Sequence, residues 1–291
     1  MSHKAAFVNI IGNPNVGKST LMNEFVGEKL SIITSKSQTT RHNIKGIVNT
    51  EDYQLVFSDT PGVLKPHYKL QESMLKFSET ALIDADIIIY VTDIYEKTDK
   101  NPEFLKRVKN AEVPVLLVLN KIDLSSQEDI VKHVEKWQDQ LPKAEIFPTS
   151  ALEKFNVKSL LNRIIELAPE GEPFFPKDQL TDKTERFFVS EIIREKILIR
   201  YKKEIPYSVQ VEVEEFKETD KIIRIRSIIC VERKSQKGII IGHKGVALKH
   251  VGIDARKDIE KFFEKQVYLE LYVKVADDWR SKSSDLSRFG Y

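Results

Sequence analysis

Residues 12–20 read GNPNVGKST, and this stretch decides the fold of the first half of the chain. It matches the pattern G-x-x-x-x-G-K-[ST] in the required context, after the apolar run Ala6–Ile11 and at the start of a helical pattern. The glycines let backbone N–H groups turn inward around a phosphate, and the N-terminus of the next helix adds its positive end. We expect Lys18 to reach the β- and γ-phosphates of a nucleotide and the Ser19 hydroxyl to bind Mg²⁺.

The surrounding pattern predicts an α/β domain with a mostly parallel sheet. Short apolar runs alternate with amphipathic stretches, which is typical of a sheet covered by helices on both faces. Ligands of such sheets bind at the carboxyl ends of the strands, where the motifs of this chain fall. The predicted strands are Ala6–Ile11, Tyr53–Phe57, Ile87–Thr92, Val113–Leu119 and Glu145–Phe147, and the predicted helices are Phe104–Asn110, Ile130–Leu141 and Lys158–Leu167.

A second motif, Ser58-Asp-Thr-Pro-Gly62, closes the next predicted strand. Asp59 can hold the metal through water, and a γ-phosphate can approach the Gly62 amide because no Cβ blocks it. Alone, such a stretch is an ordinary turn. After a phosphate loop at this distance, the functional interpretation is favoured.

A third motif, Asn120-Lys-Ile-Asp123, concerns the base. Guanine presents N1–H and a 2-amino group, and one carboxylate, Asp123, can accept hydrogen bonds from both. Adenine has an acceptor at N1 and no 2-amino group, so it would leave Asp123 unsatisfied at a cost of roughly 1–3 kcal/mol or more. The segment Thr149-Ser150-Ala151 would direct backbone N–H groups at the guanine carbonyl oxygen. The motifs therefore favour GTP over ATP.

In order and position, the motifs resemble the signature of the translation-factor class of GTPases. The resemblance implies that Thr40 closes over Mg²⁺ when GTP is bound; Thr39 is the weaker candidate, and the pair is otherwise a lead-in to a strand. It implies Ser19, Thr40 and Asp59 at the metal, and Lys18, Thr40 and Gly62 in catalysis. The nucleotide-binding residues assigned in this way are Gly12, Asn13, Pro14, Asn15, Val16, Gly17, Lys18, Ser19, Thr20, Asp59, Thr60, Pro61, Gly62, Val63, Asn120, Lys121, Ile122, Asp123, Ser150 and Ala151.

One position departs from many small GTPases, which place a Gln after the Asp-x-x-Gly motif to orient the attacking water. Here that residue is Val63, which can neither donate nor accept a hydrogen bond. We therefore expect slow intrinsic hydrolysis. In related members, the residue matching Asn15 helps to hold a potassium ion that acts in place of an arginine finger, which is our hypothesis for this chain.

The net charge of +2, from 46 Lys and Arg against 44 Asp and Glu, conceals an uneven distribution. Residues 1–176 hold 21 cations and 24 anions, whereas residues 177–291 hold 25 and 20. The stretch Lys221–His250 has eight Lys and Arg side chains and a single acid, Glu232. A charge run alone is more often a solvated face, but such a patch can also neutralise phosphates.

The second half contains a motif, Gly242-His-Lys-Gly245, that favours the interpretation of the basic stretch as a phosphate-binding surface. Helix (Asp182–Lys203), strand (Ser208–Phe216), strand (Ile222–Val231), a helical pattern, Gly242-His-Lys-Gly245, helix (Ala247–Phe263) and strand (Val267–Val275) follow in order. This order resembles a bacterial-type (type II) KH domain, a small α+β fold in which the Gly-x-x-Gly turn receives nucleotide phosphates. We expect Ile239–Ile241 and the adjacent strand to floor a groove for bases. The predicted RNA-binding residues are Arg224, Arg226, Lys237, Gly238, Ile241, Gly242, His243, Lys244, Gly245 and Lys249.

A GTP-binding domain followed by one KH domain resembles the Era family of ribosome-assembly GTPases. The predicted parts are a GTP-binding domain at 1–168, a proline-rich linker at 169–180, the KH domain at 181–276 and a tail at 277–291. The resemblance implies GTP and GDP, Mg²⁺, and binding near the 3′ end of small-subunit ribosomal RNA in the pre-ribosomal small subunit. Some members associate peripherally with the inner membrane. We expect a monomer.

Two other functions are open to the same residues. One is an RNA chaperone or scaffold whose nucleotide pocket is filled but catalytically idle, which Val63 supports. The other is an ATP pocket, which Asp123 disfavours.

Composition limits the remaining classes of protein. No stretch of this 291-residue chain approaches about 18 uninterrupted apolar residues, so no transmembrane helix is expected. The first strand begins so early that we expect no cleaved signal sequence. The single cysteine, Cys230, excludes a disulfide framework and fits a reducing cytoplasm.

Overall fold

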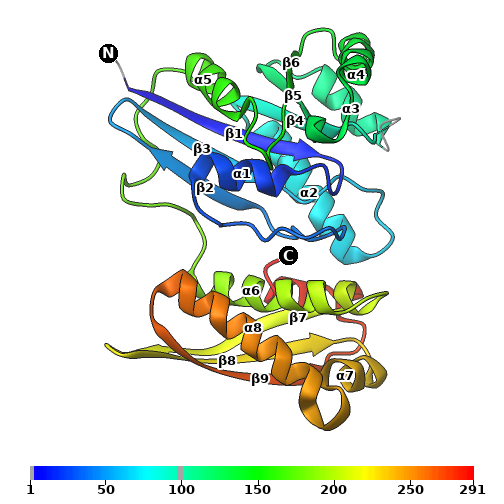
Figure 1. The fold of residues 1–291 in the computed structure, drawn as a ribbon, viewed down its shortest axis with the longest axis vertical. Coiled ribbons are helices and arrows are strands. Elements are labelled where there is room, and N and C mark those ends of the chain that lie inside the picture. Colours follow the sequence, from blue (N-terminus) through cyan, green and yellow to red (C-terminus); the bar gives the residue numbers. More distant parts are fainter. Residues whose placement is uncertain (1–2, 97–100) are drawn as a thin grey trace. The chain divides into compact units, whose positions relative to one another are not determined.

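The computed structural model describes residues 3–96 and 101–291, which divide into two compact units (Figure 1). The first unit contains residues 3–67 and 71–182, and the second contains residues 68–70 and 183–291. In the described ranges, none of the helices is long and apolar enough to cross a membrane.

The first unit is built on one six-stranded sheet in the order β2-β3-β1-β4-β5-β6. All neighbouring strands are parallel except β2, which runs antiparallel to β3 at the edge. The predicted mostly parallel sheet is therefore confirmed. The strands are β1 (Lys4–Gly12), β2 (Ile44–Asn49), β3 (Tyr53–Asp59), β4 (Ile87–Asp93), β5 (Val115–Asn120) and β6 (Glu145–Pro148).

Helices pack on this sheet because its strands are apolar on both faces. Every residue of β4 is buried, and one core cluster joins Tyr90 of β4 and Leu117 of β5 to Phe104 and Trp137 of two helices. The helices are α1 (Lys18–Val26), α2 (Lys69–Ile83), α3 (Pro102–Lys109), α4 (Gln127–Gln140) and α5 (Val157–Leu167), with a short η1 at Ile122–Leu124.

The second unit is a three-stranded sheet with its longer helices on one face. Its sheet order is β7-β8-β9, with β7 antiparallel and β9 parallel to the central strand. The predicted order of elements is confirmed. They are α6 (Glu185–Arg200), η2 (Ile205–Tyr207), β7 (Gln210–Glu218), β8 (Ile222–Val231), α7 (Lys234–Ile241), η3 (His243–Gly245), α8 (Val246–Phe263), β9 (Gln266–Val275), η4 (Trp279–Ser281) and α9 (Ser283–Arg288).

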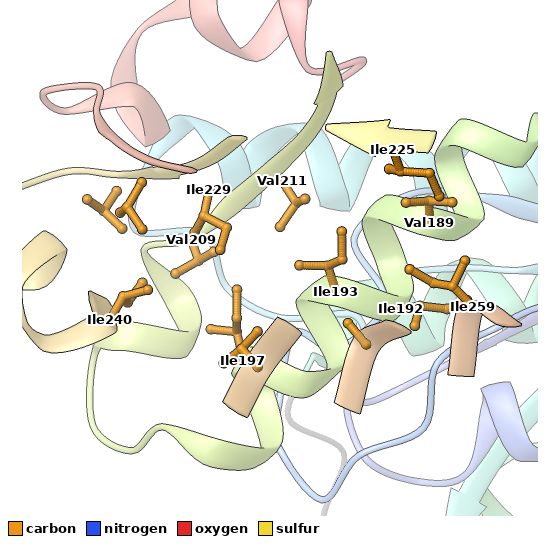
Figure 2. Packing of buried hydrophobic residues seen from close by; sticks show 14 of the residues in the cluster. Val189, Ile192, Ile193, Ile197, Val209, Val211, Ile225, Ile229, Ile240 and Ile259 are labelled. Carbon is orange, nitrogen blue, oxygen red and sulfur yellow. The ribbon is translucent and has the colours of Figure 1, made fainter. Parts of the chain in front are cut away.

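Aliphatic side chains fill the space between this sheet and its helices. Figure 2 shows Val189 of α6 beside Ile225 of β8 and Ile193 of α6 beside Val211 of β7. Their 3.6-residue spacing on the helix and two-residue spacing on the strands bring both sets to one interface. Along β9, the opposite face of the sheet carries Tyr268, Glu270, Tyr272 and Lys274.

The proline-rich segment is fastened to the first unit. The Gln54 side chain accepts from the N–H groups of Phe174 and Phe175 at 2.7 and 3.0 Å and donates to the Phe175 carbonyl. The Ile47 N–H of β2 donates to the Leu180 carbonyl at 2.8 Å. The predicted domain limits stay a prediction, but this segment is held in place rather than free.

Candidate nucleotide site and nucleic-acid groove

The loop between β1 and α1 can follow its path only with glycine at two positions. Gly12 has φ 147°, and a Cβ there would lie 2.1 Å from the Val91 carbonyl oxygen of β4. Gly17 has φ 100°, and a Cβ there would lie 2.1 Å from Nδ2 of Asn120. The glycines therefore bring the phosphate loop against the ends of β4 and β5.

Lys18 lies inside this loop. Its Nζ donates to the carbonyls of Gly12 at 3.0 Å and Asn13 at 2.8 Å, and the side chain is 6% exposed. Burial lowers the pKa of Lys18 to about 8, and the carboxylates of Asp59 and Glu96 oppose that shift. A buried ammonium ringed by backbone is well placed to receive an anionic phosphate.

The three predicted metal ligands meet at one point. The Ser19 Oγ donates to Asp59 Oδ2 at 2.7 Å and lies 2.9 Å from Thr40 Oγ1, which is 3.3 Å from the same carboxylate oxygen. Thr39 points elsewhere, because its Oγ1 lies 2.7 Å from the hydroxyl of Thr34. Of the two adjacent threonines, Thr40 therefore reaches the cluster.

The chemistry of this cluster fits Mg²⁺. Asp59 is fully buried, and burial raises its pKa even though the hydroxyl of Ser19 and the charge of Lys18 lower it. Its Oδ1 has no hydrogen-bond partner in the described chain. A hard cation bound by one carboxylate and two hydroxyl oxygens would satisfy that oxygen and keep the carboxylate ionised.

A cavity of about 380 Å³ lies over the loop. The segment Ile32–Thr40 supplies one wall, and the Asn15 Nδ2 donates to the Ser35 carbonyl at 3.2 Å. Predicted residues that line the cavity are Pro14, Asn15, Gly17, Lys18, Ser19, Thr20, Thr40, Gly62 and Lys121.

The loop after β3 touches the phosphate loop through Gly62. A Cβ on Gly62 would lie 2.6 Å from Cα and 2.7 Å from N of Pro14, so only glycine fits there. The Val63 N–H donates to the Gly12 carbonyl at 3.1 Å, and the Val63 side chain is buried in the core with Ile11. The valine therefore packs into the core and does not line the cavity.

The base end is organised by Asn120. Its Nδ2 donates to the Val16 carbonyl at 2.8 Å and its Oδ1 accepts from the Ala151 N–H at 2.9 Å. The Ser150 N–H donates to the Phe155 carbonyl. The structure thus differs from the expectation that these two amides face the guanine oxygen, because here they are already used within the protein.

Asp123 is exposed in η1 and makes no hydrogen bond to the described residues, so its carboxylate is free to accept from a base. Lys121 crosses back to the phosphate loop, with Nζ 2.7 Å from the Asn15 carbonyl and 2.6 Å from Asp93 Oδ2.

The turn after β4 belongs to the site although no sequence pattern singled it out. Glu96 is buried; its carboxylate accepts from the Thr92 hydroxyl at 2.6 Å and from the Asn13 side chain. With the Asp93–Lys121 ion pair, the turn ties the phosphate loop to the base motif. The position of Asp93 at a strand end, like that of the other motifs, is the signal that could have found it.

The second unit has a groove of about 430 Å³ beside the Gly-x-x-Gly turn. Gly245 and Lys249 of the predicted set line it. The predicted floor, Ile239–Ile241, is not part of the lining of this cavity; Ile240 is buried in the core and Ile239 is 53% exposed. The floor comes instead from Leu248 and Ile253 of α8 and from Leu269 and Leu271 of β9, with Gly252 and Arg256 completing the lining.

Arg224 and Arg226 do not line this groove. Alternate residues of a strand face opposite sides of a sheet, and Ile223 and Ile225 take the core side of β8. The two arginines therefore lie on the outer face, where Arg226 pairs with Glu270 at 3.1 Å. Lys237, Gly238, Ile241, Gly242, His243 and Lys244 flank the groove in sequence without lining its cavity.

Known families and proteins resemble each part of the chain. The family described as 50S ribosome-binding GTPase matches residues 7–121, and the KH domain family matches residues 204–280. A GTPase Era of Staphylococcus haemolyticus is 44% identical over 291 residues, covering 99% of this chain and 97% of that protein. A GTPase Era of Clostridium kluyveri is 44% identical over 290 residues, covering 99% of both.

Two solved structures match 99% of both chains with a TM-score of 0.95. One is Era in complex with MgGDPNP and nucleotides 1506–1542 of 16S ribosomal RNA, at 37% identity. The other is an Aquifex aeolicus Era variant bound to GDP and AlF4⁻, at 38% identity.

Proposed function

We propose a function from the premise that the chain belongs to the Era family of GTPases, as its full-length identity to curated members shows. It is therefore a GTPase. We propose further that it is a GTP-driven switch that binds small-subunit ribosomal RNA near its 3′ end and assists assembly of the small subunit. The observation that carries the nucleotide half is the convergence of Ser19, Thr40 and Asp59 beside Lys18.

In this proposal the phosphates of GTP occupy the loop Gly12–Ser19. Lys18 exchanges its two carbonyl partners for phosphate oxygens, and the backbone N–H groups at the start of α1 supply further donors. Ser19, Thr40 and Asp59 would hold Mg²⁺, which neutralises charge on the β- and γ-phosphates. The Gly62 amide would donate to the γ-phosphoryl group as it is transferred from GDP to water.

In this proposal, no side chain at position 63 orients the water that attacks the γ-phosphate, because Val63 is buried. Phosphoryl transfer depends on positioning and electrostatic stabilisation, which Lys18 and the loop amides still provide. Slow intrinsic turnover follows.

Guanine recognition is tested by Asp123→Asn. The change removes the carboxylate that accepts from N1–H and the 2-amino group, so GTP affinity should fall by about 10- to 100-fold, while xanthosine triphosphate should become the preferred nucleotide. Because Asp123 is exposed and unbonded, the fold should be unaffected, which thermal unfolding checks. Titrations with GTP, XTP and ATP give the measurement; an unchanged preference for GTP would show that another group reads the base.

We propose that a potassium ion near Asn15 assists hydrolysis. Asn15 has φ 66° and lines the cavity. Its side chain also contacts the Ser35 carbonyl, so the segment around Ser35, which would surround such an ion, already touches Asn15. GTP turnover should be several-fold faster in potassium than in sodium buffer at equal ionic strength. Identical rates in the two salts would refute this.

The RNA half of the proposal rests on the groove of the second unit. Its floor is apolar, its rim carries Lys249 and Arg256, and Gly242 and Gly245 open its end to phosphates. GTP would order the segment Ser35–Asn43, and β2, which follows directly, holds Leu180 of the connecting segment. That path supports nucleotide control of RNA binding.

The alternative is an RNA scaffold with an idle nucleotide pocket, which the burial of Val63 favours. Phosphate release from bound GTP separates it from a working switch. We further propose a cytoplasmic monomer that works on the pre-ribosomal small subunit.

A further inference from the structure

The outer face of the second unit's sheet, opposite its helices, carries exposed aromatic rings. Alternate residues of a strand point to opposite faces of a sheet, and Val267 and Val273 of β9 are buried on the core side. Residues 268, 270, 272 and 274 therefore point to the outer face. Tyr268 is 48% exposed and Tyr272 53% exposed. Both rings are therefore open to solvent on the same side of the sheet, four residues apart on one strand.

Basic side chains lie beside these rings. Arg224 of β8 stands opposite Tyr268, with its guanidinium 5.6 Å from the ring centroid. Neither Arg224 nor Lys274 makes an ion pair with any described residue. Arg226, by contrast, pairs with Glu270 at 3.1 Å, and Glu270 also accepts from the Tyr268 hydroxyl at 3.1 Å. Glu215 of β7, which stands opposite Arg226, is paired with Lys217 at 3.0 Å. Both acids beside the rings are therefore paired within the described chain, whereas the positive charges of Arg224 and Lys274 are not.

The same strand forms a wall of the groove. Leu269 and Leu271 line the groove, and their neighbours Tyr268 and Tyr272 face outward. In the three-stranded sheet, β9 is an edge strand, so no further strand blocks the way around it. A strand of RNA that leaves the groove can therefore pass the edge of β9 and continue on the outer face.

We propose that this face, made by Tyr268, Tyr272, Arg224 and Lys274, is a second binding surface for single-stranded RNA, continuous with the groove. The inference rests on the proposed function. Bases stack on the two tyrosine rings, which lie about 14 Å apart along the strand at four residues of about 3.4 Å each. Arg224 and Lys274 neutralise phosphates.

RNA fits this face better than a protein partner does. The cores of protein–protein interfaces are depleted of charged residues, whereas here the rings alternate with Arg224, Arg226, Glu270 and Lys274. Stacking needs only isolated rings beside cations, and it tolerates any base because every base has a π-face.

The test compares two unstructured RNAs on the full-length protein, one of about four nucleotides, enough to fill the groove, and one of about twelve. The variants are Tyr268→Ala with Tyr272→Ala, and the matched pair Tyr268→Phe with Tyr272→Phe, which keeps both rings. The alanine pair should bind the longer RNA about 100-fold more weakly, at about tenfold for each ring. It should bind the shorter RNA like wild type, and the phenylalanine pair should bind both RNAs like wild type.

Equal binding of the longer RNA by wild type and the alanine pair would overturn the inference and leave groove binding intact, pointing to a protein partner for this face. Equal losses in the alanine and phenylalanine pairs would also overturn it, because stacking needs the rings and not the hydroxyls. If wild type binds the longer RNA through the rings but not the shorter one, the outer face stands and the groove assignment fails. If neither RNA binds wild type, both fail.

Discussion

Lys18→Ala is expected to weaken GTP binding by about 100-fold and to slow phosphate release from bound GTP by a further 100- to 1,000-fold. Among the described residues, two cations line the cavity, Lys18 and Lys121. Lys121 is committed to Asp93 and to the Asn15 carbonyl and cannot replace Lys18. The measurements are a GTP titration and a single-turnover assay.

The apo protein should tolerate this change. Removing Lys18 leaves the Gly12 and Asn13 carbonyls without their donor, but it also removes a buried charge whose pKa is already lowered to about 8. Lys158→Ala, on the exposed side of α5, makes the same change in net charge and should alter neither GTP binding nor hydrolysis. Groove binding of RNA without nucleotide should also be unchanged. Full hydrolysis by Lys18→Ala would remove the lysine from the mechanism.

Gly242→Asp should abolish groove binding of RNA, with a loss of about 100-fold or more. Gly242 has φ 72° and ψ 180°, a backbone region that is essentially closed to other residues. A Cβ there would lie 2.6 Å from the Ala247 Cβ and 3.1 Å from the Ala247 N, so the turn must shift. The added carboxylate would also repel phosphates.

Two controls separate this effect from unfolding. Gly171→Asp adds the same charge in the first unit, where a Cβ would make only an ordinary contact at 3.8 Å, and should leave RNA binding intact. GTP binding by Gly242→Asp should match wild type. Normal RNA affinity in Gly242→Asp would mean that the turn does not meet the RNA backbone.

Motifs that require a particular backbone could be predicted from the sequence. The phosphate loop, Asp59–Gly62 and Asn120–Asp123 each combine an unusual residue pattern with a strand end, so their meeting follows from a parallel sheet. The continuous apolar runs also predicted β4 and β5 to within two residues.

Elements with weak patterns were not predictable in this way. The edge strand β2 contains Lys45 and Gly46 and is only partly buried, so no run or alternation indicates it. A Cβ at Gly46 would lie 2.6 Å from the Val26 side chain, a contact that only the fold creates. The helix α2, which follows the loop after β3, was likewise not predicted.

Tertiary neighbours explain the remaining errors. Ile240 looked like groove floor because it belongs to an apolar run, but α7 turns it into the core. Arg224 was predicted to bind RNA at the groove. The sequence shows that the side chains of this strand alternate between two faces, but it does not show which face the groove lies on. Glu96 acquires its role only because β4 ends beside Asn13.

The most direct test is a single-turnover assay of phosphate release from GTP bound to the full-length wild-type protein with Mg²⁺, with and without RNA. We predict slow release that runs to completion, changes rate when RNA occupies the groove, and is 100- to 1,000-fold slower still in Lys18→Ala. GTP that stays bound and intact in both conditions would contradict this and identify the chain as an RNA scaffold with an idle pocket.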